Sequence, residues 1–127
     1  MLNQPEVMWT KHSMVSAEMQ RCIQECRNCA SICLETVQHC LKLGGKHAEP
    51  AHIRMLMDCA EICQTSANFM LRGSPLHARA CALCADACDR CAESCESTAD
   101  GDEQMQRCAD ECRRCAESCR EMAGEAA

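Results

Sequence analysis

The sequence predicts an all-α protein, an antiparallel up-down-up-down four-helix bundle with a short extra N-terminal helix. Cysteines recur at alternating steps of three and four residues, as in CALCADACDRCAESC from Cys81 to Cys95, which is the spacing of inward-facing positions on a packed helix. Glycine, serine and proline interrupt this pattern between the segments, and short connections force neighbouring helices to run antiparallel. A chain of 127 residues (1–127) is expected to form a single domain.

The chain begins with an N-terminal segment that is set apart from the cysteine-rich pattern. Residues 1–15 are expected to form the short extra helix, with Pro5 in its first turn. The first long helix is predicted over 16–43, because Gly44 and Gly45 follow it directly and glycine is a common helix stop.

The second long helix is the poorest in cysteine. It is predicted over 50–72, after a loop at 44–49, and Pro50 suits its first turn. Its inward face carries only Cys59 and Cys63, where the other helices carry four or five cysteines. The density of thiols is therefore expected to be uneven along the bundle.

Two further helices complete the predicted bundle. The third is expected over 76–98, after a Gly-Ser-Pro turn in which Ser74 can cap the helix. The fourth is expected over 102–122 with Asp102 as its cap, and the tail from Gly124 onward is expected to fray.

The composition leaves the bundle interior short of bulky side chains. The chain has 16 cysteines but one tryptophan, one phenylalanine and no tyrosine. The net charge of −6 argues against a nucleic-acid partner, which requires clustered lysine and arginine. The sequence shows neither an apolar span of about 20 residues nor a secretory leader. We therefore expect no membrane association and a cytoplasmic protein with reduced thiols.

Two structural explanations for so many cysteines are weak. An inert core is disfavoured because thiols fill a bundle interior poorly and leave voids that lose dispersion contacts. A disulfide framework is disfavoured because cysteines four residues apart on a helix point along the same face, whereas a disulfide needs a dihedral angle near 90°.

Metal binding would explain the complete pattern of cysteine spacings. Seven CxxxC pairs each place two sulfurs on one helix face, and interleaved CxxC spacings connect neighbouring pairs. Soft thiolates select Cu(I), Zn(II) or iron–sulfur clusters. The predicted metal ligands are all the cysteines: Cys22, Cys26, Cys29, Cys33, Cys40, Cys59, Cys63, Cys81, Cys84, Cys88, Cys91, Cys95, Cys108, Cys112, Cys115 and Cys119.

Among these metals, Cu(I) fits best. It accepts two or three ligands, so one CxxxC pair already forms a site, whereas zinc requires four. Bacterial iron–sulfur motifs place a proline after a cysteine, and no cysteine precedes proline here. One Cu(I) per bridging thiolate also gives a neutral core, which avoids the cost of burying charge.

Two alternatives stay open at this stage. The chain could be a zinc or general soft-metal thiolate buffer. It could instead be a thiol redox protein that uses its CxxC pairs. Redox motifs of that kind begin a helix next to a strand, whereas these pairs lie within helices, so we do not expect an enzyme.

The cysteine-rich helices resemble a known family. The repeated RCAESC and CADxC units at 84–95 and 108–119, together with the CxxxC pairs over 16–122, are similar to the four-helix-bundle copper storage proteins of bacteria, in their cytosolic branch. The resemblance implies many Cu(I) ions per chain held by cysteine thiolates, a homotetramer, and storage and detoxification of copper rather than catalysis. For a protein that holds copper, a copper chaperone or an efflux protein is the expected partner.

Methionine and histidine are expected at both bundle ends, where metal would enter. Thioethers and imidazoles bind Cu(I) more weakly than thiolates, which suits a loading position. We favour the end that holds His52, because His39 and His47 lie beside it. The accessory positions are His52 and Met105 at this end, and His77, Met70 and Met122 at the other.

Overall fold

The protein is described by a computed structural model that covers residues 15–98 and 100–125. Four long helices and one short 3-10 helix make up these residues: α2 (Ala17–Leu43), η1 (Gly45–Ala48), α3 (Pro50–Leu71), α4 (His77–Thr98) and α5 (Glu103–Glu125). No strand occurs in either described stretch. The predicted all-α bundle is confirmed. The extra N-terminal helix is predicted over 1–15, of which residues 1–14 lie outside the described part, while Val15 is not helical.

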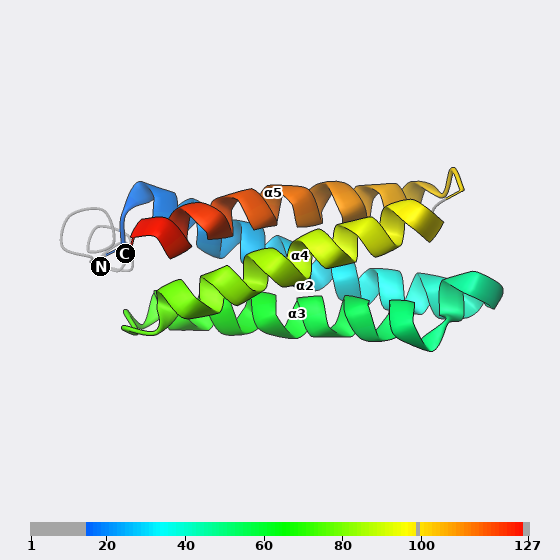
Figure 1. The fold of residues 1–127 in the computed structure, drawn as a ribbon, viewed down its shortest axis with the longest axis horizontal. Helices are drawn as coiled ribbons and strands as arrows, with labels where there is room; N and C mark the ends of the chain where they lie inside the picture. The colour runs from blue at the N-terminus through cyan, green and yellow to red at the C-terminus, as the bar shows by residue number, and fades with distance from the viewer. Residues whose placement is uncertain (1–14, 99, 126–127) are drawn as a thin grey trace, which may run out of the picture.

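The helices alternate in direction along a common axis (Figure 1). Each packs against its neighbours in sequence, and α5 returns alongside α2 to close the ring. The end that carries η1 and the α4–α5 connection is called the η1 end below, and the end with the α3–α4 connection is called the opposite end. None of the helices in the described residues is long and apolar enough to cross a membrane.

Side chains cap the starts of several helices. The Ser16 hydroxyl accepts a hydrogen bond from the Met19 amide at 3.1 Å, and the Asp102 carboxylate accepts one from the Met105 amide at 3.0 Å. These oxygens satisfy amides that have no partner within the helix. Because Ser16 and Asp102 act as caps, α2 and α5 each begin one residue later than predicted.

A side-chain cap also determines where α4 begins, after the α3–α4 connection. The Ser74 hydroxyl accepts from the Leu76 amide at 3.0 Å, and α4 begins at His77 rather than at residue 76. The helix α3 ends at Leu71, one residue before the predicted end, because Arg72 is its C-terminal cap.

The prediction is wrong at two further places, the loop after α2 and the end of α5. The segment predicted as the loop 44–49 contains the 3-10 helix η1, although Gly44, with φ of 71°, ends α2 as expected. The helix α5 continues to Glu125, so Gly124 is helical rather than frayed. Gly124 lacks the positive φ of a stopping glycine, and no proline follows it.

The interior of the bundle is filled by small side chains. Cysteine and alanine make up most of the buried residues, and the largest fully buried side chains are Leu56, Met70, Met105 and Met122. Leu56 occupies an inward position of α3 at which the other helices usually carry cysteine. Leu56 therefore supplies a large part of the apolar contact at its height in the bundle.

We expect Leu56→Ala to lower the free energy of unfolding of the metal-free protein by about 2–5 kcal/mol, because it removes buried methyl groups and leaves a cavity. Urea unfolding followed by circular dichroism measures this loss. Leu34→Ala is the matched control, since Leu34 is 56% exposed, and its effect should stay within about 0.5 kcal/mol. Equal losses in the two variants would contradict the packing role of Leu56.

Candidate metal centre

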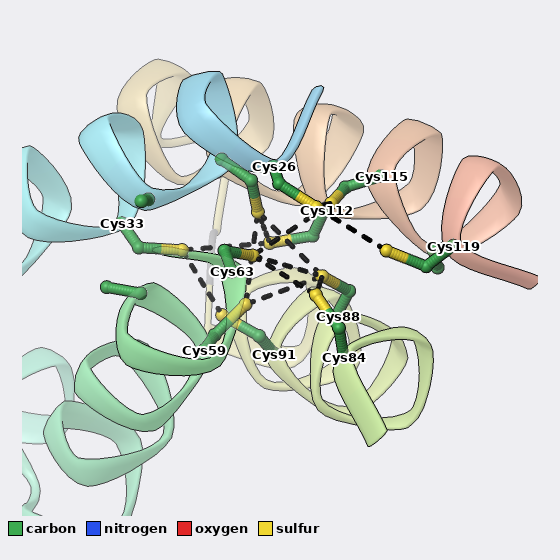
Figure 2. Close-up of a cluster of buried hydrophobic side chains, with 14 of the residues drawn as sticks. Cys26, Cys33, Cys59, Cys63, Cys84, Cys88, Cys91, Cys112, Cys115 and Cys119 are labelled. Atoms are coloured by element: carbon green, nitrogen blue, oxygen red, sulfur yellow. Dashed lines mark hydrogen bonds between the residues drawn. The ribbon is translucent and has the colours of Figure 1, made fainter. Parts of the chain in front are cut away.

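All the cysteines of the chain lie inside the bundle as free thiols. Each of the sixteen is fully buried. Their sulfurs come from all four long helices and point toward the common axis, as the labelled side chains in Figure 2 show. The heptad spacing correctly predicted this inward placement.

The cysteines of α2 and α5 meet in a regular register. Each step of three or four residues along α2 is matched by an equal step backward along α5, as expected for antiparallel helices with the same spacing. The sulfur–sulfur distances of the pairs are 3.7 Å for Cys22–Cys119, 3.7 Å for Cys26–Cys115, 3.7 Å for Cys29–Cys112 and 3.9 Å for Cys33–Cys108.

The two cysteines of α3 complete two layers at the middle of the bundle. The Cys63 sulfur lies 3.6 Å from that of Cys84 and 3.9 Å from that of Cys115. The Cys59 sulfur lies 3.9 Å from that of Cys29. Each layer then has one thiol from every helix: Cys26, Cys63, Cys84 and Cys115 in one, and Cys29, Cys59, Cys88 and Cys112 in the other.

Other residues replace cysteine in the adjacent layers of α3. One turn toward the η1 end, Leu56 stands at the height where Cys33 contacts Cys91 and Cys108. One turn toward the opposite end, the buried Ser66 donates its hydroxyl proton to the Ala80 carbonyl at 3.1 Å. The sulfur density is therefore highest at the middle of the bundle and falls toward both ends.

Contacts between layers join the thiols into one network. The Cys63 sulfur lies 3.6 Å from that of Cys88 in the next layer, and the Cys26 sulfur lies 3.6 Å from that of Cys119. Contacts of 4.0 Å or less connect the following residues without interruption: Cys22, Cys26, Cys29, Cys33, Cys59, Cys63, Cys84, Cys88, Cys91, Cys108, Cys112, Cys115 and Cys119.

The network contains overlapping groups of four sulfurs that could each hold a metal ion. The sulfurs within a group lie within 4.8 Å of one another, and groups such as Cys63, Cys84, Cys88 and Cys115 draw on three helices. Cys63, for example, belongs both to a group with Cys29, Cys59 and Cys88 and to a group that includes Cys84. Neighbouring groups therefore share thiols rather than standing as separate sites.

The contacts differ from the simplest interpretation of the CxxxC pairs. Cys84 and Cys88 do bring their sulfurs to 3.9 Å. Most of the close sulfur pairs nevertheless join two different helices. The sequence spacing reveals which thiols face inward, but only the relative heights of the helices determine which thiols meet. Metal binding by one CxxxC pair alone stays a prediction.

Three predicted residues come together at the η1 end. The Cys40 thiol donates to the Met105 thioether sulfur at 3.4 Å and lies 3.4 Å from His52 Nε2. The other ring nitrogen of His52, Nδ1, lies 2.7 Å from the Ser94 hydroxyl. The sequence analysis did not identify Ser94 as a partner of His52. Its position next to Cys95 is the one feature of the sequence that could have indicated this.

The electrostatics of this end favour a neutral imidazole. Burial lowers the pKa of His52, and the nearby His47 lowers it further, against an opposing effect of Cys108. A neutral imidazole can bind a metal ion, whereas imidazolium cannot. His52, Cys40 and Met105 thus present an imidazole, a thiol and a thioether to one another.

The opposite end lacks this arrangement among its described residues. The Cys81 thiol donates to the Met70 sulfur at 3.8 Å, and Met122 is fully buried. His77 is partly buried, and its Nδ1 lies 3.0 Å from the Ser74 carbonyl oxygen in the α3–α4 connection. Among the described residues, His77 therefore has no sulfur contact of the kind that His52 makes with Cys40. Its accessory role stays a prediction.

The thiols influence one another's protonation. Hydrogen bonds with Cys108 and Cys112 raise the pKa of Cys33, and burial adds to the rise. Hydrogen bonds from Cys112 and Cys29 lower the pKa of Cys59 against the effect of burial. Protons are thus shared within the network, and a metal ion that binds thiolates must displace them.

Cys40 lies outside the dense part of the network and shows the effect of burial most directly. Burial, together with the charges of Asp102, Cys108 and Cys91, raises the pKa of its thiol to about 11. The folded state therefore favours the neutral Cys40 thiol.

We expect the metal-free, reduced protein to lose stability as the pH rises from about 9 through about 11. A pKa raised by folding gives stability that is complete below the unfolded value of 9.0 and disappears above the folded value. Urea unfolding at several pH values measures this, and Cys40→Ser, which does not titrate, should show a smaller loss. The same pH dependence in both proteins would contradict this assignment.

A bundle whose axis is lined with free, buried thiols from four helices is a soft-metal-binding protein. A family model described as "Copper storage protein" matches residues 15–124. The chain belongs to this copper storage family, which confirms the resemblance inferred from its sequence.

Solved structures of similar proteins support this assignment. The Nmul_A1745 protein from Nitrosospira multiformis is 50% identical, with a TM-score of 0.80, over 85% of this chain and 96% of that one. The Cu(I)-bound copper storage protein BsCsp3 is 35% identical, with a TM-score of 0.77, over 84% of this chain and 98% of that one. The metal-free copper storage protein 3 from Bacillus subtilis is 36% identical, with a TM-score of 0.74, over 82% and 97% of the two chains.

One curated relative is matched over part of its length. The uncharacterized cysteine-rich protein YhjQ from Bacillus subtilis (strain 168) is 36% identical over 65 residues. This match covers 51% of the present chain and 60% of the relative, less than two thirds of its length.

Proposed function

We propose that this chain stores many Cu(I) ions along the bundle axis, with the cysteine thiolates as ligands, and so holds copper in reserve and limits its toxicity. The observation that carries this proposal is the uninterrupted network of sulfur contacts between Cys22 and Cys33 on α2 and their partners on the other helices. The Cu(I) bound by BsCsp3 supports the choice of metal.

Shared thiols favour Cu(I) over a metal that needs a complete set of ligands. A thiolate that belongs to two groups, such as Cys63 or Cys112, can bridge two ions. If each thiolate bridges two Cu(I) ions and each ion takes two thiolates, the filled interior carries one positive charge per negative charge. Neutrality matters here because all these sulfurs are buried, and an unbalanced buried charge is costly.

Zinc is the second candidate, and the geometry gives it some support. A zinc–sulfur distance of about 2.3 Å in a tetrahedron corresponds to sulfurs roughly 3.8 Å apart. The distances between Cys63 and its neighbours Cys84 and Cys115, 3.6 and 3.9 Å, are close to this value. Overlap of the groups nevertheless prevents zinc from filling all of them as isolated four-thiolate sites.

A thiol redox enzyme fits the structure less well. Reactive cysteines lie partly exposed, near positive charge or a helix start. The CxxC cysteines here, such as Cys88 and Cys91, are fully buried and lie well inside α4. We infer storage rather than catalysis for this chain.

We also propose the cytoplasm as its location, because free thiols persist in a reducing compartment. The assembly is proposed to be a homotetramer. A copper chaperone or an efflux protein would then deliver or remove the metal. In this proposal copper enters at the η1 end, since Cys40 contacts both His52 and Met105 there.

An anaerobic titration of the fully reduced protein with Cu(I), against a competing chromophoric chelator, tests the proposal. We expect saturation near one ion per cysteine, because each thiolate can bridge two ions. Added zinc should not displace the bound copper. Saturation at about four ions or fewer, or equal competition from zinc, would instead favour a zinc-type buffer, and absence of tight uptake of either metal would contradict a metal store.

The proposed entry end has its own test. We expect the double variant His52→Ala, Met105→Leu to slow Cu(I) loading and release, since it removes the imidazole and thioether that contact Cys40. Stopped-flow absorbance measures loading, and transfer to a chelator measures release. The total capacity should stay unchanged.

The control is the corresponding double variant at the opposite end, His77→Ala, Met122→Leu. Circular dichroism first establishes that both variants keep the helical fold. Unaltered rates in the His52 variant, or an equal slowing in the His77 variant, would exclude the η1 end as the preferred entrance.

A further inference from the structure

A second cluster of metal-binding side chains lies outside the sulfur network. His39 near the end of α2, His47 in η1 and Asp102 just before α5 meet at the η1 end. His39 and His47 lie on consecutive elements, whereas Asp102 is far from both in the sequence. Their donor atoms are nitrogen and oxygen rather than sulfur.

The two imidazoles converge on one carboxylate oxygen. His39 Nε2 lies 2.7 Å from Asp102 Oδ2, and His47 Nε2 lies 3.9 Å from the same oxygen. The second distance is too long for a hydrogen bond. The same Nε2 atom of His47 is inaccessible to solvent and has no hydrogen-bond partner.

An unpartnered, buried ring nitrogen is costly for a folded protein. His47 is 16% exposed and Asp102 is 15% exposed, so a ligand held between them would be largely shielded from water. An ion placed between the converging atoms would bind the orphaned nitrogen of His47 together with the His39 nitrogen and the Asp102 oxygen. Two imidazoles and one carboxylate are a donor set that suits borderline divalent ions such as zinc.

We propose that His39, His47 and Asp102 form a binding site for a divalent transition-metal ion of the zinc class, separate from the thiol network. Cu(I) prefers the thiols, since the nitrogen and oxygen donors of this site are harder ligands. The chain would then hold two kinds of metal at once. This inference does not depend on the proposed storage of copper.

The position of the site gives it a structural consequence. Asp102 accepts the Met105 amide hydrogen bond with Oδ1 and faces the histidines with Oδ2. A bound ion would therefore fasten α2, η1 and the first turn of α5 to one another. Met105 in turn contacts Cys40. An occupied site would hold in place the residues that surround the proposed copper entrance.

The test follows the imidazole nitrogens by NMR while Zn(II) is added to the full-length protein. Saturation with Cu(I) beforehand occupies the thiols, and a failure of copper storage would already show at this loading step. We expect the Nε2 resonances of His39 and His47 to shift together and to saturate at one Zn(II) per chain. His77, at the opposite end, should not shift. Because the readout is specific to each residue, it remains valid even if thiols bind some of the zinc.

A pair of matched variants tests the carboxylate. Asp102→Asn keeps an oxygen that can cap α5 but loses the negative charge, because asparagine caps as well as aspartate does. We expect it to weaken Zn(II) binding at this site by about tenfold or more. Asp100→Asn removes the same charge from the same connection, where Asp100 pairs with Lys46, and should have little effect.

Three outcomes would overturn the proposal. The first is an absence of shifts at His39 and His47 when zinc is in excess. The second is a shift of only one of the two nitrogens, and the third is equal zinc affinity in the Asp102 and Asp100 variants.

Discussion

The relative height of antiparallel helices is the constraint on which the rest of this structure depends. Heptad spacing brings a thiol to the axis every three or four residues. The four-sulfur groups of this bundle form only where thiols from several helices also lie at one height. The equal steps along α2 and α5 provide this, from Cys22–Cys119 at one end of the run to Cys33–Cys108 at the other. An insertion of one residue into a helix would rotate the cysteines that follow it by about 100° away from the axis. Any substitution that alters helix height therefore acts on every layer at once.

The distribution of cysteine on α3 determines where the network is complete. Cys59 and Cys63 supply the fourth thiol of the two central layers, whereas Leu56 and Ser66 take that place in the layers beside them. A core built only of thiols would lose dispersion contacts when it is empty, because sulfur side chains are small. The buried Leu56 and the methionines toward the ends compensate for this. The metal-free bundle can then stay folded while its centre remains dense in ligands.

Periodicity predicted nearly all of the fold and the identity of the inward cysteines, such as Cys22 and Cys119. Helix spacing is a local property, so a single sequence reveals it. It did not predict which thiols meet across the bundle, since that depends on how helices slide past one another during packing. Nor did it predict the contact of His52 with Ser94, or the convergence of His39 and His47 on Asp102. Those contacts join segments that have no common pattern.

The network also explains why metal and protons must compete for the same atoms. Buried thiols joined by hydrogen bonds, such as Cys29, which donates to Cys112, cannot all lose their protons without a cation to balance them. Each Cu(I) ion brings one positive charge, so copper can replace protons step by step while the interior stays close to neutral. Zinc brings two charges and requires four thiolates, which leaves a negative charge on each site and more protons to remove per ion. Charge balance in a dry core thus favours a monovalent soft ion. The cluster of His39, His47 and Asp102 at the η1 end is matched to a borderline divalent ion by its donor types instead, two imidazoles and one carboxylate.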